Sequence, residues 1–149
     1  MGKLAHRFWA VGTVAGAAAV GRLAAADAAD VYARLDKPRW APPAWLFGPA
    51  WGLLYLANVG AGLRSATATE KILHTAQLAL NAAWTPLFFG RRRQRAALSV
   101  IAALDAAVIA EIVVLARRDR VAAALLVPYA GWLLYATALT AAVEDPRAA

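Results

Sequence analysis

The chain has 149 residues, a net charge of +7 and a hydrophobic content of 62%, with a mean hydropathy of +0.52. Ordinary soluble domains are only about 45–50% apolar, so this composition favours a single-domain membrane protein over a soluble enzyme. The chain contains no cysteine, which excludes a disulfide framework, a thiolate metal site and a cysteine nucleophile. Because the basic residues lie between apolar stretches, anionic lipid explains the charge better than nucleic acid, and no nucleic-acid partner is expected.

Five apolar stretches follow one another along the chain, each close to the roughly 20 residues that a helix needs to cross a bilayer. They cover residues 8–26, 43–62, 72–90, 96–116 and 121–143. Backbone groups in lipid must be hydrogen-bonded within the segment, so each stretch is expected to be a helix. The sequence therefore predicts an all-α membrane protein, a single five-helix transmembrane domain over residues 1–149, with a long loop at 27–42.

The first stretch has a second interpretation. Two basic residues precede it and small residues follow it, a pattern that also fits a cleaved signal peptide. The pair Gly12 and Gly16 favours instead a retained helix that packs closely on another helix. On the third stretch, the pair Ala79 and Ala83 likewise suits close contact between helices. These small-residue faces predict a homodimer.

An odd number of spans places the two ends of the chain on opposite sides of the membrane. Basic residues are slightly more numerous on the side of the C-terminus, so the positive-inside rule predicts a cytoplasmic C-terminus. The Ala- and Arg-rich composition is typical of bacterial proteins and predicts the bacterial cell membrane as the location.

The segment "DKPRWAPPAWLFGPAW", residues 36–51, holds three of the six tryptophans and four prolines. Proline fixes φ near −65° and pushes the preceding residue out of the helical region, which predicts a stiff, extended segment. Pro43 is expected to be the first helical residue of the second span. Trp40 and Trp45 are expected at the membrane interface, where amphipathic rings are common.

Trp51 is expected deeper, about two turns into the helix. Phe47 and Tyr55 lie four residues before and after it, so the three rings share one face. This face is either ordinary core packing or the wall of a cavity, and the spacing alone leaves both open.

The third span, "QLALNAAWTPLFFG" at residues 77–90, carries one helical stripe of polar and aromatic residues. Its members are Gln77, Asn81, Trp84, Thr85 and Phe88. An amide in mid-membrane is costly against lipid, so the stripe is expected to face the bundle interior. It serves either a ligand or hydrogen bonds between helices, and Pro86 is expected to disturb the helix.

The fifth span adds a third deep tryptophan. Trp132, Ala136 and Thr140 recur every four residues, and Pro128 is expected to bend the helix. Aromatic walls with a few polar groups predict a site for a flat apolar ligand with polar edges.

The fourth span contains two acids, Asp105 and Glu111, and intramembrane acids are functional candidates. They are six residues apart and do not share a face. Asp105 is alternatively a protonated hydrogen-bonding residue, and Glu111 is expected to reach towards Arg117 and Arg118. The two histidines are too far apart in the chain to indicate a haem or metal site, and His74 is expected near a membrane surface.

Three blocks resemble the translocator protein family, also called tryptophan-rich sensory proteins or peripheral benzodiazepine receptors. They are "KPRWAPPAWLFGPAWGLLY" at 37–55, "QLALNAAWTPLFFG" at 77–90 and "VPYAGWLLYATALT" at 127–140. The resemblance implies a five-helix bundle, often dimeric, whose pocket lies beneath the first loop. It also implies binding of porphyrins and of synthetic isoquinoline or benzodiazepine ligands, with cholesterol binding in animal members.

Carried over by position, the resemblance implies a set of ligand-binding residues in this chain. They are Tyr32, Phe47, Trp51, Asn81, Trp84, Thr85, Trp132 and Ala136. Some members are reported to promote light-dependent porphyrin breakdown, for which Trp51 and Trp132 are the candidate catalytic residues. The chain has Thr140 where the family usually has Asn, and no basic residue follows Tyr135 within five positions, so the proposed sterol motif is absent.

The leading hypothesis is a membrane receptor or sensor that binds tetrapyrroles, with enzymatic activity left open. The alternative is a small transporter of porphyrin or another hydrophobic ligand, proton-coupled through the two intramembrane acids, and a third is a structural partner protein. The sequence shows no phosphate-binding loop or metal cluster, and no cofactor is expected.

Overall fold

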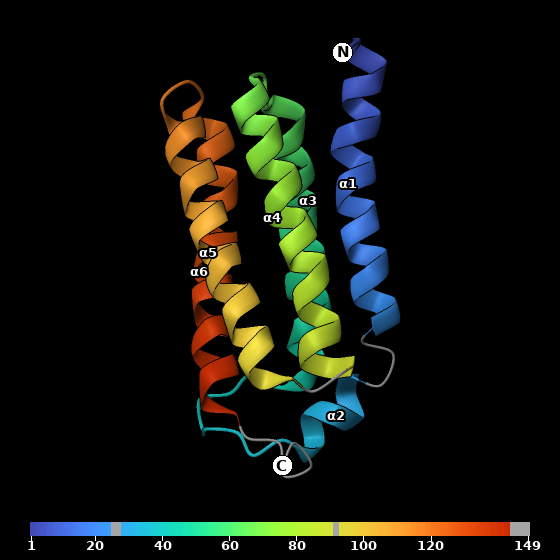
Figure 1. Cartoon of the computed structure of the whole chain (residues 1–149), viewed down its shortest axis with the longest axis vertical. Coiled ribbons are helices and arrows are strands. Elements are labelled where there is room, and N and C mark those ends of the chain that lie inside the picture. Colours follow the sequence, from blue (N-terminus) through green and yellow to red (C-terminus); the bar gives the residue numbers. More distant parts are fainter. Residues whose placement is uncertain (25–27, 91–92, 144–149) are drawn as a thin grey trace.

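The computed structural model describes residues 1–24, 28–90 and 93–143, and every secondary-structure element in these ranges is a helix. The long helices are α1 (Lys3–Ala24), α3 (Phe47–Arg64), α4 (Ala68–Thr85), α5 (Gln94–Ala116) and α6 (Arg120–Ala142). They run side by side along the long axis of the molecule, and the short helix α2 (Ala28–Arg34) lies across one end (Figure 1). The predicted all-α fold is confirmed.

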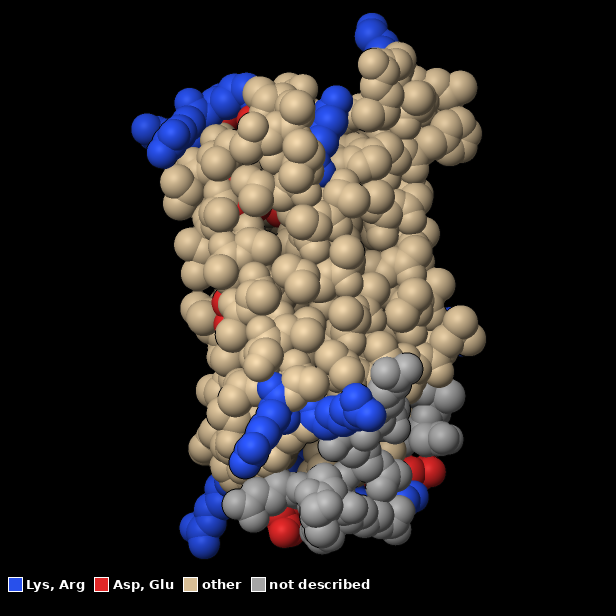
Figure 2. All heavy atoms as spheres, in the orientation of Figure 1, with Lys and Arg blue, Asp and Glu red and all other residues tan. Residues whose placement is uncertain are grey.

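Three described segments are long and apolar enough to cross a membrane by length and composition: Ala44–Arg64, α5 and α6. A fourth is added if α1 and α2 count as one bent span. The predicted count of five spans is thus not established by these criteria: α1 meets them only together with α2, and α4 does not meet them. On the face shown in Figure 2, Lys and Arg gather near the two ends, and the broad band between them is almost free of charged atoms.

The low hydropathy of α4 comes from its buried face. Glu70, His74, Gln77 and Asn81 follow one another at intervals of four, three and four residues, and each is at most 1% exposed. This spacing keeps them on one side of the helix, which faces α3, α5 and α6. Polar groups turned inward lower the mean hydropathy of α4 without exposing a polar surface to lipid.

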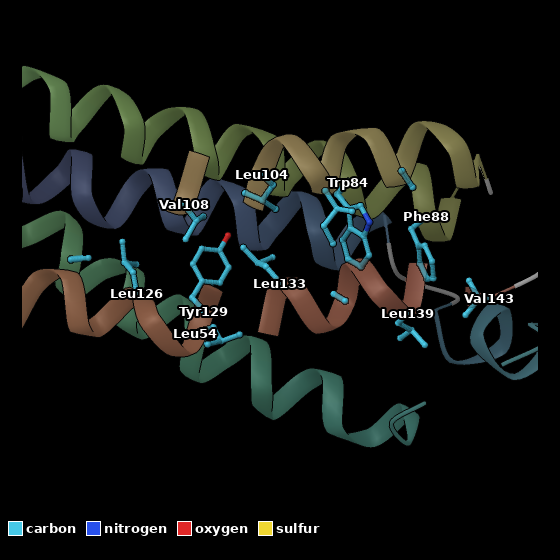
Figure 3. Packing of buried hydrophobic residues seen from close by; sticks show 14 of the residues in the cluster. Leu54, Trp84, Phe88, Leu104, Val108, Leu126, Tyr129, Leu133, Leu139 and Val143 are labelled. Atoms are coloured by element: carbon cyan, nitrogen blue, oxygen red, sulfur yellow. The ribbon is translucent and has the colours of Figure 1, made fainter. Parts of the chain in front are cut away.

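The core lies mainly between α5 and α6. The buried positions repeat at intervals of four and three on both helices, as in left-handed helix pairs: Ala97, Ile101, Leu104, Val108, Glu111 and Leu115 on α5, and Ala122, Leu126, Tyr129, Leu133, Ala136 and Thr140 on α6. Figure 3 shows Leu104 and Val108 beside Tyr129 and Leu133. α1 stands outside this seam and packs mainly on α3 and α4.

The predicted boundaries need several corrections. The predicted loop at 27–42 contains α2, and Pro43 is not the first helical residue: it is extended (φ −65°, ψ 147°) and precedes a 3-10 turn at Ala44–Leu46, so α3 begins at Phe47. A φ near −65° suits an extended cap as well as a helix, so the proline ring alone does not decide between them.

Pro86 disturbs its helix as predicted, because α4 ends at Thr85 and the chain continues as a π-helical turn over Pro86–Gly90. Residues 25–27 of the first span and loop, and the arginines at 91 and 92, lie outside the described residues.

Hydrogen bonds fix the proline-rich segment to α2 and α6. The Tyr32 hydroxyl donates to the Pro42 carbonyl (2.6 Å), and Lys37 Nζ donates to the Tyr32 and Leu35 carbonyls at the end of α2 (2.5 and 3.1 Å). The Tyr135 hydroxyl of α6 donates to the Trp40 carbonyl (2.6 Å). These bonds hold α2 and the segment after it against the end of the bundle.

Ion pairs join the helices at the opposite end. Arg118 donates to both Glu70 carboxylate oxygens (2.8 and 2.9 Å), and Arg64 pairs with Asp119 (2.8 Å). Glu70 also forms a capping box with Thr67 at the start of α4. The hydrogen bonds from Arg118 are the main reason that the pKa of Glu70 falls to about 2, with further bonds from the Ala66 and Thr67 amides.

Candidate functional site: an aromatic cavity

A cavity of about 590 Å³ lies at the α2 end of the bundle, between α1, α2, α3 and α4. Its lining consists of Ala18, Gly21, Arg22, Ala28, Ala29, Tyr32, Ala44, Phe47, Gly48, Trp51, Gly52, Tyr55, Trp84 and Thr85. Small-molecule sites are typically about 300–1,000 Å³ and mostly apolar. The size and lining of this cavity therefore suit an organic ligand.

One wall of the cavity is aromatic. Phe47, Trp51 and Tyr55 lie along one face of α3, as their four-residue spacing predicts, and Trp84 of α4 stands beside them. Trp51 is at the centre of this wall: its ring centroid is 5.6 Å from that of Tyr55 and 6.4 Å from that of Trp84. Tyr32 of α2 closes the wall with an edge contact to Phe47 at 5.1 Å. Such a wall offers a flat ligand several ring faces and edges.

Small residues leave the space that the aromatic rings surround. A Cβ atom added at Gly48 or Gly52 of α3 would meet nothing within 4 Å, so these positions border open volume. A Cβ atom at Gly21 of α1 would lie 3.5 Å from the Tyr55 hydroxyl and 3.7 Å from Thr85 Oγ1. Both distances are ordinary van der Waals contacts, so position 21 of α1 lies directly beside the polar corner of the cavity.

The polar groups of the cavity are few. Tyr55 donates its hydroxyl hydrogen to Asn81 Oδ1 (3.1 Å). Arg22 lies in the last turn of α1, and the described lining contains no carboxylate to pair with it. The lining therefore combines an apolar aromatic wall with a small corner that holds hydroxyl groups and one cation.

Five of the eight ligand-binding residues inferred from the resemblance line this cavity: Tyr32, Phe47, Trp51, Trp84 and Thr85. The other three do not. Ala136 is packed in the α6 seam, and Trp132 lies behind the wall, with its centroid 5.9 Å from Phe47 and 6.3 Å from Trp51. Asn81 is buried behind Tyr55.

Sequence reasoning missed the cavity residues of α1 and the glycines of α3. Gly48 and Gly52 are four residues apart and adjoin Phe47 and Trp51, a spacing that could have indicated a gap beside the rings. The α1 residues carried no such signal, because Ala18 and Gly21 belong to a run of Ala and Gly that looks alike on every face.

The amides of the third span take part in a hydrogen-bond network between helices. Gln77 Nε2 donates to Asn58 Oδ1 (2.7 Å), and the Tyr129 hydroxyl donates to Gln77 Oε1 (3.0 Å). Asn81 Nδ2 donates to the Tyr129 oxygen (3.0 Å) and its Oδ1 accepts from Tyr55. The stripe of α4 faces the interior as predicted, and the network joins α3, α4 and α6. Asn81 links this network to the cavity through Tyr55.

The prediction for Glu111 was wrong. Glu111 does not reach the arginines at the end of α5, because its Oε1 lies 2.6 Å from His74 Nδ1. Both side chains of this pair are fully buried inside the bundle. Both occupy inward positions on adjacent helices, α4 and α5, and an acid in such a place requires a nearby partner. Asp105, the other acid, accepts a hydrogen bond from Thr137 (2.6 Å).

The chain is similar to known proteins over most of its length. The TspO/MBR family model matches residues 9–144. The "Tryptophan-rich protein TspO" of Archaeoglobus fulgidus is 44% identical over 119 residues, which cover 75% of this chain and 76% of that protein. The human "Translocator protein" is 43% identical over 117 residues (72% and 69%), and the "Tryptophan-rich sensory protein" of Cereibacter sphaeroides is 38% identical over 112 residues (72% and 71%).

Proposed function

Because the chain belongs to the TspO/MBR family, we propose that it is a membrane receptor that binds porphyrins and related flat apolar ligands in the cavity between α1 and α4. The observation that carries this proposal is the aromatic wall formed by Phe47, Trp51, Tyr55 and Trp84. A macrocycle presents a broad apolar face, which an indole ring can stack on or meet edge-on.

The positions of the two intramembrane acids support a receptor more than a transporter. Both intramembrane acids that suggested proton-coupled transport have a polar partner inside the bundle, Glu111 with His74 and Asp105 with Thr137. Neither acid lines the cavity. The acids therefore have roles that do not require a transport cycle, and binding is the function that the cavity supports best.

The proposal includes the membrane arrangement. All five long helices span the bilayer, α4 with its polar face inward, and the C-terminus lies in the cytoplasm of a bacterial cell. Two copies associate through small-residue faces, because Gly12, Gly16, Ala79 and Ala83 all lie exposed on the outside of the chain.

The test is to fill the cavity. Gly52→Leu adds a side chain to open volume within the cavity, and Gly131→Leu is the matched control, because Gly131 lies on α6 outside the cavity and also has no atom within 4 Å of an added Cβ. Quenching of tryptophan fluorescence by a porphyrin in detergent micelles measures affinity. We expect Gly52→Leu to lose at least tenfold in affinity while Gly131→Leu retains it. Equal affinity of both variants and the wild type would place the ligand elsewhere.

A further inference from the structure

A continuous chain of hydrogen bonds runs from the cavity into the middle of the bundle. It starts at a hydroxyl group of the cavity lining, passes through α4 and α6, and ends on the backbone of α3. Its members, in order, are Tyr55, Asn81, Tyr129, Gln77, Asn58 and the Leu54 carbonyl. The four side chains between its two ends are at most 1% exposed, so they depend on one another for partners.

The inner end of the chain sets its direction. Asn58 Nδ2 lies 3.0 Å from the Leu54 carbonyl oxygen, which can only accept a hydrogen bond. Asn58 therefore presents its Oδ1 to Gln77, whose Nε2 donates to it (2.7 Å). This orientation turns Gln77 Oε1 towards Tyr129, and that oxygen accepts the hydroxyl hydrogen (3.0 Å). Because each amide has one accepting and one donating end, every step dictates the next.

The same direction continues to the cavity. The Tyr129 oxygen has given its hydrogen away, so it accepts from Asn81 Nδ2 (3.0 Å). Asn81 Oδ1 then accepts the only hydrogen of the Tyr55 hydroxyl (3.1 Å). The Tyr55 oxygen is thus left with lone pairs for the cavity and no hydrogen. Turning that hydrogen towards a ligand would leave Asn81 Oδ1 buried without a partner, which is costly.

We propose that Tyr55 determines the ligand specificity of the cavity by selecting flat ligands with an N–H or O–H donor at the edge that faces it. The inference rests on the proposed function, because it concerns the same cavity. An acceptor at that edge, such as an ether oxygen, meets lone pairs and is disfavoured. Asn58 is a positioning residue, because it fixes the hydrogen of Tyr55 from the far end of the chain.

The rest of the polar corner leaves this role to Tyr55. A Cβ atom at Gly21 would lie 3.5 Å from the Tyr55 hydroxyl oxygen and 3.7 Å from Thr85 Oγ1, so both oxygens face one place. The Thr85 hydroxyl is able to donate or accept, so it adapts to either kind of ligand. Arg22, which also lines the cavity, offers donors only and suits an accepting or acidic edge. The cavity therefore favours a ring system with an acidic group at one edge and a donor at another.

The first test uses three tricyclic probes of nearly equal size and shape. Carbazole carries an N–H donor, dibenzofuran has an oxygen acceptor at the same position, and fluorene has a CH2 group there. Calorimetric titration of the full-length protein in detergent micelles, with empty micelles subtracted, gives the affinities. We expect the wild type to bind carbazole about tenfold more tightly than dibenzofuran, with fluorene between them. Gly52→Leu should weaken all three, because it fills the cavity.

The hydroxyl of Tyr55 is tested by its removal. Tyr55→Phe should abolish the preference for carbazole while fluorene still binds, because the ring remains and only the oxygen is lost. The matched control is Tyr135→Phe, which removes a hydroxyl that lies outside the cavity lining and donates to the Trp40 carbonyl. This control should keep the tenfold preference. Comparing the affinity ratio between variants cancels the different partition of the probes into micelles.

The second test concerns the direction of the chain. Asn58→Leu removes the fixed end, so the amides of Gln77 and Asn81 are free to turn and the hydrogen of Tyr55 is released to the cavity. The ratio of carbazole to dibenzofuran affinity should then fall about tenfold, although Asn58 does not line the cavity. Tyr129→Phe is a smaller change that breaks the chain in its middle, and it should have the same effect. A role in packing alone would weaken all three probes equally and leave the ratio unchanged.

The outcomes separate this inference from the proposed function. An equal affinity ratio in the wild type and Tyr55→Phe, or no binding of any probe, would overturn the role of Tyr55. An unchanged ratio in both Asn58→Leu and Tyr129→Phe would overturn the role of the chain. A tenfold preference that Tyr55→Phe abolishes, together with a porphyrin affinity that Gly52→Leu does not change, would support the inference and overturn porphyrin as the ligand of this cavity.

Discussion

Trp132 lies directly behind Trp51, with ring centroids 6.3 Å apart and ring planes at 85°. Only Trp51 of the two lines the cavity. The two candidate catalytic residues are therefore not equivalent: Trp51 can contact a bound porphyrin, whereas Trp132 can act only through the wall. Trp132 Nε1 is also buried without a hydrogen-bond partner, so its position depends on ring packing.

This difference gives a graded prediction for light-dependent porphyrin loss. Indole is far easier to oxidise than benzene, and phenylalanine keeps much of the stacking area. Trp51→Phe should retain most of the porphyrin affinity but should strongly slow the light-dependent fall in porphyrin absorbance. Trp132→Phe should slow that fall by a smaller factor. The measurement is porphyrin absorbance under illumination, with dark samples as controls. Equal bleaching by the wild type and by empty micelles would mean that the cavity only binds.

Arg22 gives a prediction for ligand selectivity. A guanidinium at the edge of an apolar cavity favours a carboxylate on the ligand, and a partly exposed ion pair contributes on the order of 1 kcal/mol. Arg22→Gln should weaken binding of protoporphyrin IX severalfold and leave its dimethyl ester unaffected. Arg34→Gln, which removes an exposed arginine of α2 outside the lining, is the matched control. Loss of affinity for both compounds would assign Arg22 a structural role.

Association of two chains is predicted to depend on small residues of α4. Leucine at positions 79 and 83 adds bulk where two backbones would approach closely. Ala79→Leu/Ala83→Leu should shift the crosslinked population towards monomer while the helical content stays constant. Ala102→Leu/Ala106→Leu makes the same change on an exposed face of α5 and should remain dimeric. If both double variants crosslink as the wild type does, α4 is not in the interface.

Acid is predicted to weaken the end of the bundle that holds Glu70. The pKa of Glu70 in the folded protein is about 2, against an ordinary value of 4.5. The ionised carboxylate therefore stabilises the folded state fully at pH values above about 4.5. This contribution is lost as the pH falls from about 4.5 towards 2. Because Arg118 is partly exposed, we expect the Glu70 carboxylate to contribute only roughly 1–2 kcal/mol to the free energy of unfolding.

The measurement for Glu70 is Tm in detergent between pH 2 and pH 7. Glu70→Gln should lower Tm at pH 7 and flatten its fall in acid, and Asp30→Asn on exposed α2 should change neither. A wild type and a Glu70→Gln variant with parallel Tm profiles would show that other carboxyl groups cause the acid effect.

Local spacing predicted the features that lie within one helix. The inward stripe of α4 and the shared face of Phe47, Trp51 and Tyr55 follow from helical periodicity, so both were accessible from the sequence. The pair His74–Glu111 joins residues 37 positions apart, and no local pattern specifies which helices meet. The contribution of α1 to the cavity was hidden for a different reason, because an Ala-rich helix has no distinct face.

The inward polar face of α4 has a consequence for how the chain is made. A helix that carries His74, Gln77 and Asn81 is poorly retained by lipid on its own, because each of these groups is costly in hydrocarbon without a partner. Asn58 of α3 comes first along the chain and Glu111 of α5 and Tyr129 of α6 come later. During synthesis α4 therefore depends on the helix before it to enter the bilayer, and on the two helices after it to stay there.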